Sequence, residues 1–61
     1  MTSSGELIRM MNYVDDIAAT MRRIQTASAL ISAEERKRLA EYMRNTNPSY
    51  LKVLEELERG A

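Results

Sequence analysis

The 61-residue chain contains neither cysteine nor histidine. These two absences exclude disulfide bridges, Cys/His zinc sites, covalent haem attachment, Cys-His nucleophiles and imidazole general bases. The reactive groups that remain are carboxylates, hydroxyls and amines, and no glycine-rich loop gathers them into a site. We therefore expect a protein that is not an enzyme and that uses no metal or other cofactor.

An excess of one charge and a long apolar run are also missing. Nine lysines and arginines balance nine aspartates and glutamates, so the chain lacks the cationic excess of proteins that bind nucleic acid by neutralising phosphates. No segment approaches the roughly 18 to 20 consecutive apolar residues that span a bilayer, and the N-terminus lacks the basic and apolar regions of a secretory signal. We expect a cytoplasmic protein with no membrane contact.

Proline and glycine are scarce, and their positions divide the chain into helices. Residues 4–30 contain no proline and no glycine after Gly5, which predicts one long helix over this range. Ser3 followed by Glu6 has the spacing of a capping box. Apolar residues recur in a heptad pattern, and with their neighbours they cover an arc of about 160°, wider than a two-stranded coiled coil requires. We call this set the predicted seam: Leu7, Met10, Val14, Ile17, Met21, Ile24 and Ile31.

Two shorter helices are expected after the long one. Ser32 with Glu35 forms a second capping box and predicts a helix over residues 33–44, whose apolar stripe is thin. Asn47-Pro48 predicts a third helix over about residues 48–59, with Asn47 as N-cap and Pro48 at the first helical position. Gly60 suits its C-terminal end.

No segment has the alternating pattern of a strand, so the sequence predicts an all-α fold. In this fold a long N-terminal helix is followed by two shorter helices, within a single small domain over residues 1–61. A chain of this length without disulfides or a metal buries too little apolar surface to be stable alone, and association is the usual remedy. We therefore expect a homodimeric helical bundle built on the predicted seam.

This architecture predicts a protein–protein interaction module: a small regulator, inhibitor or assembly factor that acts as a helical homo-oligomer, with a dimer favoured. Methionine is abundant on the apolar arc, and its flexible side chain repacks readily against irregular partners. A candidate surface for a further protein partner, whose identity is unknown, consists of Ile8, Met11 and Tyr13.

Two alternative functions remain open at this point. One is a small DNA- or RNA-binding regulator that presents basic faces twice in a dimer, and it predicts a steep salt dependence of binding. The acidic character of the third helix argues against its use in reading base edges. The other alternative is a structural subunit of a larger assembly. The candidate nucleic-acid contacts are Arg22, Arg23, Arg36, Lys37 and Arg38.

Overall fold

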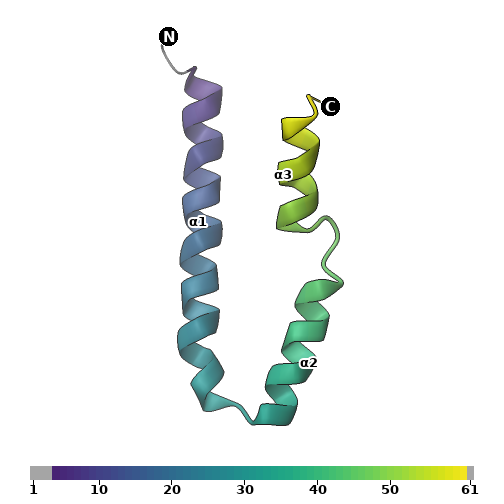
Figure 1. The fold of residues 1–61 in the computed structure, drawn as a ribbon. Coiled ribbons are helices and arrows are strands. Elements are labelled where there is room, and N and C mark those ends of the chain that lie inside the picture. The colour runs from purple at the N-terminus through teal and green to yellow at the C-terminus, as the bar shows by residue number, and fades with distance from the viewer. Residues whose placement is uncertain (1–3, 61) are drawn as a thin grey trace. The chain divides into compact units, whose positions relative to one another are not determined.

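The structure is a computed structural model that describes residues 4–60. Within this range the chain is helical and contains no strand, which confirms the predicted fold class. Along the chain, the elements are α1 (Gly5–Ala27), the 3-10 turn η1 (Ser28–Leu30), α2 (Ala33–Arg44) and α3 (Tyr50–Glu58), as Figure 1 shows. The chain divides into two compact units at the Ile31–Ser32 boundary, so α1 and η1 belong to the first unit and α2 and α3 to the second.

The start of α1 is set by Ser4. Its backbone is extended (φ −73°, ψ 159°) and its Oγ accepts a hydrogen bond from the N–H of Leu7 at 3.1 Å. The predicted N-cap, Ser3, lies outside the described residues, and the capping role belongs to the next serine along the chain. Glu6 in the first turn forms an ion pair with Arg9 at 3.3 Å. A carboxylate at this end of a helix is also favoured by the helix dipole.

The end of α1 differs from the prediction. The α-helix stops at Ala27, and the chain tightens into η1. The Oγ of Ser28 donates to the carbonyl of Gln25 at 2.7 Å, and such a local side-chain bond competes with regular helix hydrogen bonding. Ile31 then has an extended backbone (φ −116°, ψ 162°). Ile31 therefore lies beyond α1, the helix that carries the other members of the predicted seam.

The start of α2 has the capping box that the sequence predicts. The N–H of Glu35 donates to Ser32 Oγ at 3.1 Å, and the N–H of Ser32 donates to Glu35 Oε1 at 3.3 Å. This reciprocal pair satisfies two backbone groups that a helix end would otherwise leave unpaired. Near the other end of α2, Glu41 pairs with Arg44.

The start of α3 corrects the prediction at Asn47 and Pro48. Ser49 is the N-cap: its backbone is extended (φ −86°, ψ 160°) and its Oγ accepts from the N–H of Lys52 at 3.1 Å. Serine and asparagine are equally good N-caps, and the serine two residues later takes the role, so that Pro48 precedes the helix. After α3, Gly60 has a positive φ of 76°, the left-handed conformation that glycine adopts readily at helix ends.

Candidate interaction surfaces

The feature of both units that bears most on function is the exposure of their apolar side chains. No residue in the described range is buried. Among the larger aliphatic side chains of this range, the half-buried ones are Ile24, Ile31 and Leu39. Contiguous exposed apolar surface on a soluble chain marks a site of association. The distribution of the apolar side chains on each helix therefore defines the candidate surfaces.

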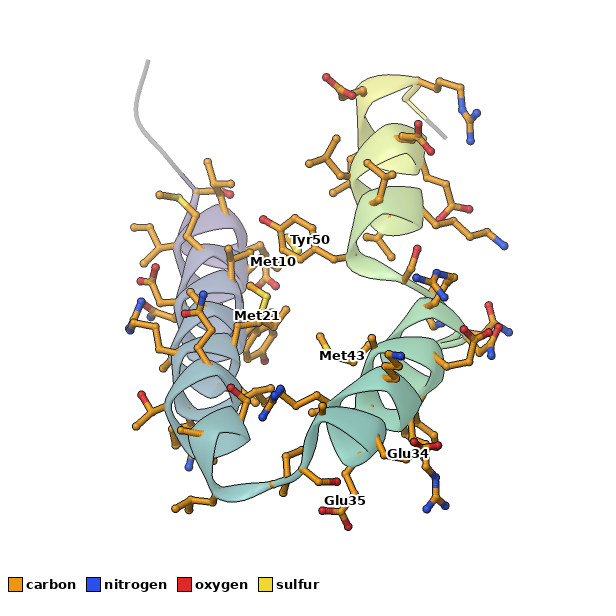
Figure 2. The ribbon with its side chains drawn as sticks, turned by 60° about the horizontal axis from the view of Figure 1, so that its bottom comes forward. Met10, Met21, Glu34, Glu35, Met43 and Tyr50 are labelled. Carbon is orange, nitrogen blue, oxygen red and sulfur yellow. The ribbon has the colours of Figure 1, made fainter. Side chains whose placement is uncertain are left out.

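The longest apolar surface lies on α1. We define the α1 stripe as the members of the predicted seam that lie within this helix: Leu7, Met10, Val14, Ile17, Met21 and Ile24. Their alternating spacing of three and four residues places them on one side of the helix, and Figure 2 shows Met10 and Met21 projecting from the same side of α1. From first to last the stripe extends about 26 Å along the axis. The exposed fractions of Met21 and Met10 are 42% and 52%.

The edges of the α1 stripe are almost free of charge. Met11 and Ala18 flank it on one edge, and Tyr13 and Thr20 flank it on the other. Glu6, at the N-terminal end, is the charged residue on these edges. Met11, Ala18 and Tyr13 widen the surface to the arc of about 160° expected from the sequence, enough for contact with two neighbouring helices.

The residues predicted as a partner surface do not form one patch on α1. At 100° per residue, Met11 and Tyr13 lie about 160° apart, on opposite edges of the α1 stripe. Ile8 lies about 60° beyond Met11, toward the side that carries Asp15 and Arg22. Met11 and Tyr13 therefore extend the α1 stripe, and Ile8, 53% exposed, is separate from it.

A second apolar surface, none of whose residues is among the predicted site residues, lies on α3. Its residues follow the spacing of an amphipathic helix: Tyr50, Leu51, Val53, Leu54 and Leu57. Leu57 is the most exposed of them, at 72%. The spacing of these residues is visible in the sequence, but α3 has only nine residues, so its surface is much shorter than the α1 stripe.

The basic residues predicted to contact nucleic acid do not converge within either unit. Arg22 and Arg23 point about 100° apart on α1, and Arg23 donates to Thr20 Oγ1 at 3.3 Å. On α2, Arg36, Lys37 and Arg38 are consecutive and point to three sides of the helix. Each run therefore spreads its charge around a helix, as expected of a solvated surface.

Neither the acidic side chains nor a depression after α2 forms a metal site or a charged ligand site within residues 4–60. Asp15 and Asp16 are adjacent on α1 and diverge by about 100°. Within residues 4–60 no group of three or more acidic side chains is placed to hold a metal ion. A shallow depression of about 340 Å³ follows α2 and is lined by Tyr42, Asn45, Thr46 and Asn47, none of them charged.

The helices of the described part of the chain also lack the length and apolar character needed to cross a membrane. In comparisons with known proteins, no family model, curated protein or solved structure matches the chain. Its function is therefore inferred from its own residues, and the α1 stripe is the most extensive surface they form.

Proposed function

We propose that the chain is a non-enzymatic protein–protein interaction module that self-associates through the α1 stripe, with a homodimer as the favoured state, and acts as a small regulator, inhibitor or assembly factor. The observation that carries this proposal is the exposure of the α1 stripe from Leu7 to Met21, along most of a 23-residue helix. The heptad spacing of the stripe fits the packing of one helix against another helix of the same kind.

The energy available from the α1 stripe is of the same order as the cost of association. Burying an aliphatic side chain completely contributes about 1.5 to 3 kcal/mol, so side chains that are already half covered by their own helix contribute about 1 kcal/mol each. Two stripes together give on the order of 10 kcal/mol, which is comparable with the roughly 4 to 15 kcal/mol cost of association. Because the gain and the cost are of the same size, we expect self-association to depend on every member of the stripe, so that one unfavourable side chain abolishes it.

The test is a charge placed in the middle of the α1 stripe. Ile17→Asp buries an unpaired carboxylate in each copy of the interface, and we expect it to convert the protein to a monomer. Thr26→Asp, an equally drastic change on the far side of the same helix, is the matched control and should leave association intact. Light scattering at tens of micromolar measures the mass of each variant.

Two results of this experiment contradict the proposal. One is a wild-type chain that runs at the mass of a single copy over the whole micromolar range. The other is an equal effect of Ile17→Asp and Thr26→Asp, which would mean that association does not use the α1 stripe.

The regulatory part of the proposal requires a second protein. We expect a tagged chain to co-purify with a partner in a fixed stoichiometric ratio, and Ile17→Asp to lose that partner if it recognises the oligomer. If the chain self-associates but co-purifies with no stoichiometric partner, the regulatory role is wrong. The proposed self-association would still stand.

A further inference from the structure

We infer that the α1 stripe is covered by α1 of a second copy that runs in the opposite direction, with a two-fold axis at the level of residues 15 and 16. This inference rests on the proposed self-association and adds the orientation of the two chains. It follows from the order of side chains along the stripe and on its edges.

The α1 stripe is symmetric about its own midpoint. When two copies are placed antiparallel about the level between residues 15 and 16, Leu7 faces Ile24 of the second copy, Met10 faces Met21, and Val14 faces Ile17. Every member of the stripe then meets another member, so none is left against a polar side chain. The midpoint also lies near the centre of α1 (Gly5–Ala27), so the two helices overlap along almost their whole length.

The edges of the stripe are complementary in size in this arrangement. On one edge Met11 lies beside Ala18 of the second copy, and on the other edge Tyr13 lies beside Thr20. The axial offset within each of these pairs is about 3 Å. Each large side chain thus has a small neighbour, which is how close packing is reached without voids or clashes.

A parallel pair fits the same residues less well. It would place Ile17 against Ile17 and Ile24 against Ile24, at the heptad position where parallel two-stranded coiled coils favour leucine over β-branched residues. It would also set the Glu6 carboxylate beside Met11 and align the two helix dipoles with like ends together. Glu6 is the charged residue on the edges of the stripe, so the edges offer no pair of opposite charges across the interface. The packing of apolar side chains therefore decides whether the two helices run parallel or antiparallel.

The absence of cysteine makes a direct test possible, since one substitution gives one thiol per chain. Met10→Cys and Met21→Cys are mixed and oxidised, and the disulfides are identified by mass. Antiparallel helices bring residue 10 of one copy to residue 21 of the other, whereas the two residues 10 are separated by about 16 Å along the axis. Cα atoms more than about 7 Å apart do not form a disulfide without backbone movement.

We expect the mixed disulfide between Met10→Cys and Met21→Cys to dominate, and the symmetric disulfides to fall to the level of a Thr26→Cys control. Thr26 lies off the stripe and reports chance collisions. Symmetric disulfides in excess of the mixed one overturn the antiparallel orientation and leave the proposed self-association standing. Light scattering on the wild type, which uses no cysteine, tests the self-association separately.

A second measurement leaves the stripe unaltered. A nitroxide label on Thr26→Cys is expected to be separated from its counterpart by about 31 Å along the axis in the antiparallel pair, and by almost no axial distance in a parallel pair. Electron–electron double resonance distinguishes the two distances. A short distance, set by the helix diameters alone, would contradict the antiparallel orientation even if the cysteine variants of the stripe failed to associate.

Discussion

At the scale of single residues, serine hydroxyls set where the helices begin. Ser4, Ser32 and Ser49 each accept a hydrogen bond at 3.1 Å from the backbone N–H three residues further along. Ser32 could be identified from the sequence because Glu35 completes its capping box. Ser4 and Ser49 could not, because each has a competing cap within two residues, Ser3 and Asn47, and helix propensity alone does not separate such neighbours.

The choice between Ser49 and Asn47 can be measured. We expect Ser49→Ala to lower the free energy of unfolding by about 1 kcal/mol, because it removes the acceptor for the N–H of Lys52. Asn47→Ala should have little effect, since Asn47 lies before the helix and does not cap it. Denaturant unfolding followed by circular dichroism measures both. A larger loss for Asn47→Ala would mean that α3 begins two residues earlier in solution.

At the scale of elements, the heptad pattern of α1 could be predicted and its C-terminal limit could not. Periodicity identifies the side of a helix that carries apolar residues, and the members of the predicted seam from Leu7 to Ile24 all lie within α1. The predicted seam included Ile31 because the apolar spacing continues to this residue in the sequence, although the α-helix ends at Ala27. The hydrogen bond from Ser28 Oγ to the Gln25 carbonyl competes with the backbone hydrogen bonds of the helix. The spacing of apolar residues carries no information about this competition.

The methionines offer a test of which helix surface is covered. Met21 on α1 and Met43 on α2 have nearly equal exposed fractions, 42% and 44%. In the associated protein we expect Met10 and Met21 to be oxidised by dilute peroxide more slowly than Met43, because the stripe excludes the reagent. Mass spectrometry of the peptides gives the three rates.

The protection should vanish in Ile17→Asp, in which Met21 and Met43 are expected to react at similar rates. Equal rates for Met21 and Met43 in the wild type at every concentration would indicate that the α1 stripe stays open to solvent.

At the scale of the whole molecule, the all-helical class could be predicted because no segment alternates and each helix has a start or stop signal of its own. The single domain and the homodimer stay predictions. Both depend on contacts between helices that are far apart in sequence, and the spacing of apolar residues within one helix does not specify which surface that helix meets. No described side chain is buried, so the stability of the fold depends on what covers these surfaces.

This dependence leads to an expected effect of protein concentration. If association supplies the burial that one chain lacks, the melting temperature of the wild type rises with concentration, by mass action. For Ile17→Asp we expect no dependence on concentration. The variant either melts at the same temperature at every dilution or has a low helix content at every dilution. Circular dichroism over about a hundredfold range of dilution makes the comparison. A wild-type curve that is the same at every dilution would show that a single chain is stable.

The exposed α1 stripe also bears on the lifetime of the chain. If association is what covers the α1 stripe, a newly made copy exposes it until it meets a second copy, and exposed apolar segments of this kind are what chaperones and proteases act on in unfolded proteins. Copies made in excess would be cleared, whereas assembled copies would be spared. The amount of this protein would then follow the number of its assemblies rather than its rate of synthesis.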